Sequence, residues 1–538
     1  MARDVESNRI VIASRARAAA RMVPAAFLAL FFVLPVTTLL ADHLRIGAIL
    51  DVVGDDSLRG VAWFSLWQGV VSTALTLAIG MPATWAVTRW RFPGSGILAS
   101  MMTIPFLMPA VVMATGVAAL LPPRGIPAIL WTHVAFNLSV VLRVVGPTWA
   151  LLDHSLEESA ASLGASGWKV FRAVTWPAIS ESVQNAASLV FVFCATSFAV
   201  VSILGGATVR TIESEVFTRA VRLGDLRTAT ALAMIQAVAV LAVLGLSRIR
   251  ESEVTTRKIP ERRKVSHRIR MPWLPPAVAG VGAIVACAPL LAVAVRSLRH
   301  GGEWNLTGWR VLGDGTLLRI GIDVGDMART TLLFASACAL ITVVLALLAS
   351  GHPRRSIVEQ VSLAPLFMSS VTLGLGIIVA FDSAPLDWRG HTWLIPLVHS
   401  VIALPLAVRV IGPALRGIDG ELAVMAADLG AGPVRRWWTV TLPLLMPAIG
   451  RAAAISAAVS VGEFGATSFL ARSGSTTVSI AISNLMGRPG PLLQQTAFAL
   501  STLTWIIVLL VSILPRLGHA PRERRRRLVE VPSRSWTQ

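Results

Sequence analysis

Four polar side chains that could bind a small charged solute lie within long apolar stretches of the sequence. They are His133, Asn137, His399 and Glu463. A carboxylate in apolar surroundings can pair with a cation, and imidazole and amide groups can donate and accept hydrogen bonds. We expect these residues to line a polar pathway or a gate. The alternative for each histidine is a structural hydrogen bond to a neighbouring helix.

Two phenylalanines could form an apolar gate, or pack in the core. Phe464 directly follows Glu463, whereas Phe198 follows Ser197. A lining built from both segments would therefore be asymmetric. A carboxylate beside aromatic rings would suit a cationic solute, because cations are attracted to ring faces.

Residues for enzymatic chemistry do not form a recognisable pattern. None of the three lysines (Lys169, Lys258 and Lys264) follows a glycine, so the Gly-Lys-Ser/Thr loop that cradles nucleotide phosphates is absent. The nine histidines show no metal-ligand spacing, and the three cysteines lie in apolar runs as small buried hydrophobes do. We expect no catalytic residues, no metal and no cofactor in this chain.

The elements that must position the polar residues are membrane helices. Hydrophobic residues make up 54% of the 538 residues and charged residues only 14%, whereas a soluble protein carries about a quarter. The formal charge of +19 lies outside the apolar runs, and no polar stretch is long enough to form a basic nucleic-acid-binding domain. The surplus apolar surface must face membrane lipid.

Twelve apolar runs are long enough to cross a bilayer, which takes about 20 residues. The expected spans are 22–40, 61–88, 98–121, 126–149, 183–208, 229–247, 273–296, 329–350, 357–381, 392–415, 444–471 and 496–515. The first run has no evident cleavage site after it, so we interpret it as a membrane helix and not as a signal peptide. The sequence predicts an all-α polytopic membrane protein.

Arginine and lysine are concentrated in alternate loops. They are densest in the linker 248–270 and in the tail 519–538, whereas the first intervening loop holds Asp51, Asp55 and Asp56. Because cytoplasmic loops retain basic residues, both termini are expected in the cytoplasm. The linker separates two membrane halves, 1–247 and 271–518, and both basic segments are interpreted as solvated chain touching anionic lipid headgroups.

The two six-helix halves repeat one another in sequence. The matched pairs, each 266 residues apart, are His133 and His399, Gly164 and Gly430, Pro177 and Pro443, and Phe198 and Phe464. Asn137 has Ala403 as its counterpart. Parallel repeats predict a pseudo-two-fold axis along the membrane normal, and gates and binding sites tend to lie where such repeats meet.

One repeated segment is polar and is expected in the cytoplasm. It occupies 157–177 in the first half and 424–443 in the second. A short helix with small residues on one face ends at Gly164 or Gly430, where glycine can adopt a positive φ. A second short helix follows and is expected to stop where Pro177 or Pro443 begins the next span. Each copy predicts a helical hairpin that offers a close approach to a partner.

These hairpins resemble the coupling motif of binding-protein-dependent ABC permeases, which reads Glu-Ala-Ala, three residues, Gly, nine residues and Ile-x-Leu-Pro. The matching residues are Glu158, Ala160, Gly164, Val174 and Pro177 in the first copy, and Ala426, Gly430, Val440, Leu442 and Pro443 in the second. Ser159 and Trp176 depart from the motif, and Val424 replaces the glutamate in the second copy.

The resemblance implies a fused two-half permease with the type I ABC importer fold. In that family each hairpin docks on a cytoplasmic ABC ATPase, so two ATPase copies are expected, and ATP is bound there. An extracytoplasmic substrate-binding protein would deliver the solute. A secondary transporter is the competing class, because it also has twelve spans and a repeat. That class would need ion-coupling residues and broken helices instead of paired hairpins.

Within the family, fused permeases of thiamine and ferric-iron importers share this length and layout. Stretches that look closest to the thiamine type are 64–68, 91–94, 133–137, 194–198 and 204–213. The segment 461–467 fits either type, and the chain has no tyrosine to act as an iron ligand. The resemblance favours thiamine or a related small cation as the substrate, with ferric iron as the alternative.

Overall fold

The structure is a computed structural model that describes residues 22–121, 125–206, 208–248, 273–300, 302–350, 357–418, 420–472 and 474–517. Most of these residues are helical. Among them the only strands are β1 (Arg299–His300) and β2 (Glu303–Trp304), which pair antiparallel with Arg299 opposite Trp304. For the linker 248–270 and the tail 519–538 we predicted solvated chain. Arg248 is the last residue of a helix, and the rest of the linker and the whole tail lie outside the described residues.

The first half contains a helix over Met22–His43, which includes a π turn and α2. Its elements are η1 (Ala29–Val33), α2 (Leu34–His43), α3 (Ile46–Gly54), α4 (Asp56–Arg89), α5 (Ser95–Thr103), η2 (Ile104–Leu107), α6 (Ala110–Leu120), α7 (Ile126–Leu151), α8 (His154–Ser162), α9 (Gly167–Val170), η3 (Phe171–Thr175), α10 (Trp176–Ala195), α11 (Phe198–Leu204), α12 (Ile212–Phe217), η4 (Thr218–Arg222) and α13 (Leu226–Arg248).

The second half repeats this order. Its helices are α14 (Leu274–Ser297), α15 (Thr307–Val311), η5 (Thr316–Ile320), α16 (Val324–Ser350), α17 (Ile357–Val361), η6 (Ala364–Phe367), α18 (Ser370–Ala380), α19 (Leu394–Arg416), α20 (Gly420–Asp428), α21 (Pro433–Arg436), η7 (Trp437–Thr441), α22 (Leu442–Gly462), α23 (Gly465–Leu470), α24 (Val478–Gly487) and α25 (Pro491–Leu517).

Ten of the described helices are long and apolar enough to span a membrane, or up to twelve if each of two bent pairs counts as one span. The predicted all-α polytopic fold is therefore confirmed. The bent pairs fall at 98–121 and 357–381, where we expected straight spans. The axis turns by 111° between η2 and α6 and by 103° between η6 and α18.

The bends have a local cause in the residues at the break. Met108 is extended at ψ 147°, as is favoured for a residue that precedes proline, here Pro109. In the second half Ser369 stands at the same place, and its hydroxyl caps α18 by accepting the N–H of Val371 at 3.1 Å. The apolar composition of both runs concealed these breaks.

The expected stop at the motif prolines is wrong. Gly167–Ala195 and Pro433–Gly462 are each continuous helices that pass through Pro177 and Pro443. A π turn precedes each proline, so that Trp176 N–H bonds Phe171 O five residues earlier. This wider turn accommodates a proline ring that would otherwise clash with the preceding turn. The second helix of each hairpin therefore joins a membrane span rigidly.

The halves exchange their first helices. Helix α14 packs against α4, α5, α6 and α7 of the first half, whereas α2 packs against α18 of the second. Both crossings bring backbone close to backbone. A Cβ added to Gly116 would lie 2.3 Å from the carbonyl oxygen of Pro289, and one added to Gly376 would lie 2.9 Å from that of Pro35.

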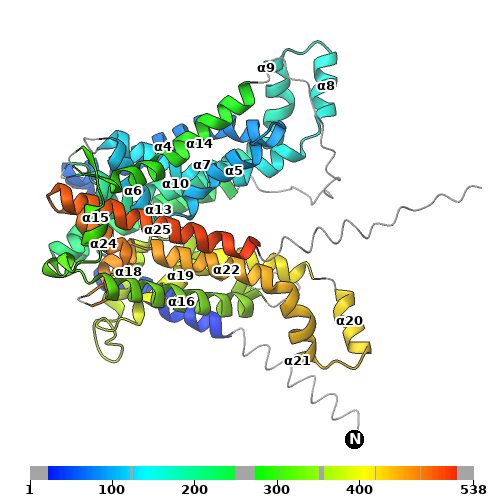
Figure 1. Ribbon diagram of the computed structural model, residues 1–538. Coiled ribbons are helices and arrows are strands. Elements are labelled where there is room, and N and C mark those ends of the chain that lie inside the picture. The colour runs from blue at the N-terminus through cyan, green and yellow to red at the C-terminus, as the bar shows by residue number, and fades with distance from the viewer. Residues whose placement is uncertain are drawn as a thin grey trace, which may run out of the picture.

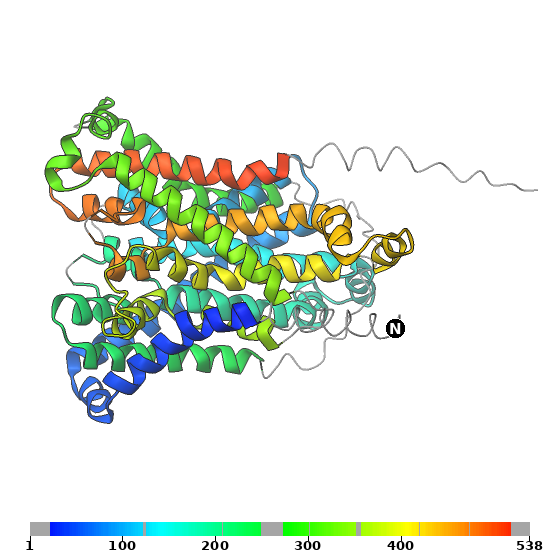
Figure 2. The same ribbon diagram turned by 90° about the horizontal axis from the view of Figure 1, so that it is seen from below.

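The two helical bundles meet at one end and diverge toward the other (Figure 1). The hairpins α8–α9 and α20–α21 project from the diverging end, one from each bundle. In the view from below (Figure 2), the first described helix and α25 also have their outer chain ends on this side. We call the end where the bundles meet the closed end; the opposite end, where they diverge, carries the two hairpins.

Candidate functional site

The first hairpin has a helix end of the kind that the motif predicts. The side chain of Asp153 caps α8 by accepting the N–H of Ser155 at 3.0 Å, and this hydrogen bond lowers the pKa of the Asp153 carboxyl. At the other end Gly164 has φ 84°, its N–H donates to Ala161 O at 2.9 Å, and Ala165 N–H donates to Ala160 O at 3.2 Å. This is a glycine C-cap that closes the helix.

The second hairpin reproduces this geometry. Gly430 has φ 78°, its N–H donates to Ala427 O at 2.8 Å, and Ala431 N–H donates to Ala426 O at 2.9 Å. The predicted positive φ is therefore present at both glycines. Among the described residues, no atom outside the neighbouring residues lies within 4 Å of a Cβ built on Gly164 or Gly430. Backbone conformation, and not crowding within the chain, is what requires glycine there.

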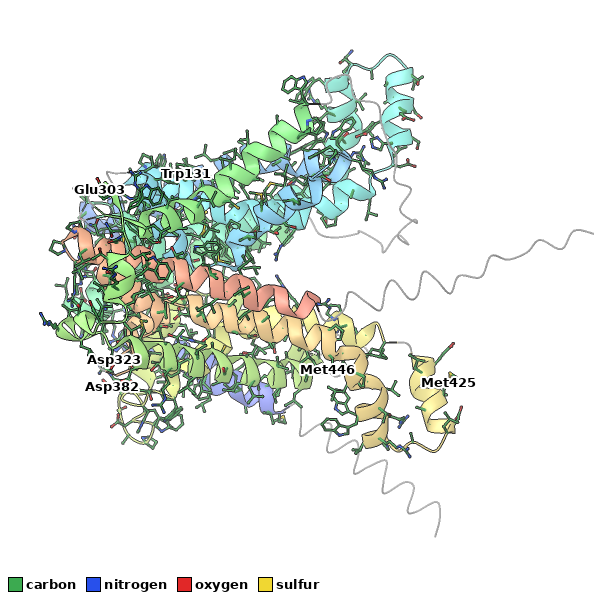
Figure 3. The ribbon with its side chains drawn as sticks, viewed as in Figure 1. Trp131, Glu303, Asp323, Asp382, Met425 and Met446 are labelled. Carbon is green, nitrogen blue, oxygen red and sulfur yellow. The ribbon has the colours of Figure 1, made fainter. Side chains whose placement is uncertain are left out.

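The hairpins expose apolar side chains at matched positions. Leu163 is 89% exposed and Leu429 is 87% exposed, and each directly precedes its glycine. Met425 on α20 is 60% exposed and points away from the bundle in Figure 3. Glu158 is exposed on α8, and Val424 holds the equivalent place on α20. Solvent-exposed apolar side chains in two equivalent places are typical of contact surfaces.

A salt bridge that the sequence analysis missed ties the first hairpin to its bundle. Arg89, at the end of α4, pairs with Glu157 on α8, and the other carboxylate oxygen of Glu157 accepts the hydroxyl of Thr175 at 2.6 Å. Arg89 also donates to Leu152 O at 2.7 Å. The motif directed attention to Glu158. Adjacent residues on a helix point about 100° apart, so only one of the two glutamates can face the bundle.

We expect Glu157→Ala to slow coupled transport strongly, because it leaves the guanidinium of Arg89, which is 5% exposed, without its anion. Glu158→Ala is the matched control, one residue away and exposed, and should be much milder. ATP-driven uptake by the purified complex in liposomes measures both. The double variant Arg89→Leu, Glu157→Leu should recover part of the loss. Equal effects of the two single alanine variants would contradict a special role for Glu157.

The candidate gate lies where the bundles meet. The rings of Phe198 and Phe464 stack with centroids 5.3 Å apart and planes at 22°. Both are nearly buried, at 6% and 7% exposed. Because they are equivalent residues of the two halves, their contact lies on the pseudo-two-fold axis. Phe217 also packs against Phe198, with ring centroids 5.2 Å apart and planes at 44°.

The predicted polar residues lie inside the two bundles. His133 Nδ1 is 3.0 Å from Ser72 Oγ, and Asn137 donates to His133 O at 2.9 Å. His399 lies between Ser460 and Thr467 in the other half. All of these side chains are buried, so the structure places each histidine in hydrogen bonds between helices. A role for them along the pathway stays a prediction.

No protein-family model matches the sequence. The chain is 25% identical over 451 residues to the thiamine transport system permease protein ThiP of Salmonella typhimurium, which covers 78% of this chain and 82% of that protein. It is also 25% identical over 519 residues to the probable ABC transporter permease protein y4fN of Sinorhizobium fredii, covering 88% and 90%.

A third relative decides the family. Over 219 residues the chain is 35% identical to the putative 2-aminoethylphosphonate transport system permease protein PhnV of Salmonella typhimurium, covering 41% of this chain and 76% of that protein. The chain belongs to the ABC transporter permease family. It is a multi-pass membrane permease with two fused halves, and its broken helices are consequently not a sign of a secondary transporter.

Proposed function

We propose that this permease imports thiamine or a related small organic cation, with the energy supplied by two copies of a separate ABC ATPase. The observation that carries the coupling part is the pair of hairpins with equal glycine caps and equally exposed leucines, Leu163 and Leu429. Each hairpin continues into a membrane span, so a displacement of the hairpin by the ATPase would also move that span. The absence of a phosphate-binding loop in the sequence is consistent with ATP binding in a partner.

The direction of transport follows from the expected topology. We propose that the hairpin end faces the cytoplasm of a bacterial cell, because the basic residues of the sequence are concentrated in the loops assigned to that side. The closed end, with the Phe198–Phe464 gate, then faces outward and receives solute from an extracytoplasmic binding protein. Both chain termini lie in the cytoplasm in this arrangement.

The substrate class rests on the relatives and on the gate. Thiamine, named for one relative, is an organic cation, whereas 2-aminoethylphosphonate, named for another, joins a positively charged nitrogen to an anionic phosphonate. The gate presents two phenyl rings, Phe198 and Phe464, and a cation over such a ring gains roughly 0.5–2 kcal/mol. These two rings would let an organic cation pass, and the rings themselves carry no oxygen atom that could bind a bare metal ion.

Calorimetry on the partner binding protein tests the substrate. We expect saturable thiamine binding at nanomolar concentration, which is about 12 kcal/mol of binding free energy. Uptake of labelled thiamine by the reconstituted complex should then require both ATP and the binding protein. Binding of 2-aminoethylphosphonate without thiamine would move the substrate to that class. Ferric ion binding without a response to thiamine would move this permease to the iron importers.

Labelling of introduced cysteines tests the topology. The three native cysteines are buried, so they should give little background. Cysteines at Asp55 and Asp314 should react with an impermeant maleimide in intact cells, and cysteines at Lys258 and Arg525 only after permeabilisation. Reaction at Lys258 from outside would contradict the proposed orientation.

A further inference from the structure

The two gate phenylalanines lie at the starts of short helices that we call gate helices. Phe198 is the first residue of α11, and Phe464 is the N-cap residue of α23. In the second half a buried carboxylate closes the junction between α22 and α23. Glu463 accepts the N–H of Ala466 at 2.9 Å and that of Thr467 at 2.8 Å, and also accepts the Thr467 hydroxyl. Phe464 lies between Glu463 and the residues to which Glu463 is hydrogen-bonded, so these bonds restrain the backbone of Phe464.

His399 extends the same network to a third helix. Its Nδ1 is 2.8 Å from Ser460 Oγ on α22, and its Nε2 is 2.9 Å from Thr467 Oγ1 on α23. Nε2 also lies 3.5 Å from the carboxylate of Glu463. These side chains are at most 6% exposed. Buried hydrogen bonds between fully enclosed partners resist rearrangement, so α23 is fastened to both α19 and α22.

The first half lacks this fastening. Ser197 and Val201 stand in the places of Glu463 and Thr467, and α11 has no side-chain cap. His133, the counterpart of His399, bonds Ser72 on α4 through Nδ1, and its buried Nε2 has no hydrogen-bond partner among the described residues. Buried side chains do hold the end of α10, where Gln68 donates to Cys194 O at 2.9 Å and Gln236 to Ala195 O at 3.2 Å. Among the described residues, however, no side-chain hydrogen bond reaches 198–204, so α11 itself is held by apolar packing.

We propose that the gate opens from one side: Glu463 and His399 are positioning residues that keep α23 and Phe464 fixed, while α11 moves and carries Phe198 away. This deepens the proposed function, because it takes the Phe198–Phe464 contact as the closed gate. Apolar packing has no directional bonds to break, whereas moving α23 away from α19 would break the buried hydrogen bond between His399 Nε2 and Thr467 Oγ1 and would separate His399 from the Glu463 carboxylate. Movement of α11 therefore costs less free energy than movement of α23.

Hydrogen exchange of the complete permease–ATPase complex in nanodiscs tests the fastening directly and without a substrate. In the wild type, amides of 199–204 should exchange faster than those of 465–470. Glu463→Ser should raise exchange in 465–470 by about tenfold, the effect of losing a helix cap on local opening. Glu463→Gln keeps one acceptor oxygen and should restore part of the protection, and Ser197→Ala, the matched control, should change neither segment.

The reverse experiment transfers the fastening to the first half. The double variant Ser197→Glu, Val201→Thr offers the unpartnered Nε2 of His133 a carboxylate. It should slow exchange in 199–204 and lower ATP-driven uptake of labelled thiamine several-fold, because both gate helices are then fixed. Ser197→Ala, Val201→Thr is its control and should transport normally.

Two results would overturn the inference. One is equal exchange in the two gate helices of the wild type, and the other is an unchanged 465–470 segment in Glu463→Ser. A failed gate assignment has a different signature. In that case liposomes that contain the Phe198→Ala or the Phe464→Ala permease would not leak thiamine in the absence of ATP. The difference in hydrogen exchange between α11 and α23 would still be observed.

Discussion

Replacement of Gly164 by valine should abolish the coupling of ATP hydrolysis to transport while leaving the membrane spans folded. At φ 84° a β-branched residue costs about 1–3 kcal/mol of local strain. The end of α8 would have to unwind to relieve it and would move the exposed Leu163. We expect ATP-driven uptake by the complex in liposomes to fall about tenfold or more. Gly430→Val should have a comparable effect if the two hairpins contribute equally.

Two further substitutions separate backbone conformation from contact with the ATPase. Gly164→Asn adds a larger side chain than Gly164→Ala, but asparagine tolerates the left-handed region better. If the backbone conformation at position 164 limits coupling, the Gly164→Asn variant should transport better than Gly164→Ala. If close approach of the ATPase limits coupling, Gly164→Ala should transport better. Gly167→Val, three residues away at a helical position without positive φ, is the control. Normal uptake and normal ATPase stimulation in Gly164→Val would refute the coupling role.

Replacement of Gly116 by valine should prevent assembly of the permease. The new Cβ would lie 2.3 Å from the backbone oxygen of Pro289, so α14 could not stay in its place against α6. Overpacking a well-packed contact costs about 1–3 kcal/mol, and more where backbone must shift. We expect little monodisperse protein after detergent extraction, measured by size-exclusion fluorescence, and a lower melting temperature for what remains.

The pseudo-symmetric contact provides an internal comparison. Gly376→Val meets Pro35 at 2.9 Å and should be harmful to a lesser degree. Gly280→Val on α14, where no atom of the described part of the chain lies within 4 Å of the added Cβ, is the control and should assemble normally. Equal yields for Gly116→Val and Gly280→Val would contradict the close helix crossing.

Much of the architecture was predictable from the sequence because a bilayer restricts the choices. Long apolar runs in lipid must be helices, since the backbone has no other partner there. The sequence repeat also indicated which residues occupy equivalent positions in the two halves, which composition cannot do. Equivalent residues of two parallel halves lie symmetrically about one axis, so Phe198 and Phe464 could be named as a gate pair before their stacking was seen. Gly164 and Gly430 were identifiable because only glycine suits a helix end with positive φ.

The tertiary structure decided which helices are neighbours. Apolar composition marks a segment as buried or lipid-facing but does not name its partner, so the exchange of α2 and α14 between the halves was not predictable. The bends at 98–121 and 357–381 were missed for a similar reason. Hydropathy is the same for a straight and a broken helix, and the break depends on how Pro109 and Ser369 are accommodated.

The polar contacts show the same division most clearly. The sequence alone determined that Glu157 and Glu158 lie on a hairpin and that His133 and His399 are equivalent. Only the three-dimensional packing brought Arg89 to Glu157 and not to Glu158, and only packing gave His399 the partners Glu463 and Thr467. A hydrogen bond needs its two groups within about 3 Å, and residues 60 or more positions apart meet at that distance only through the arrangement of whole helices.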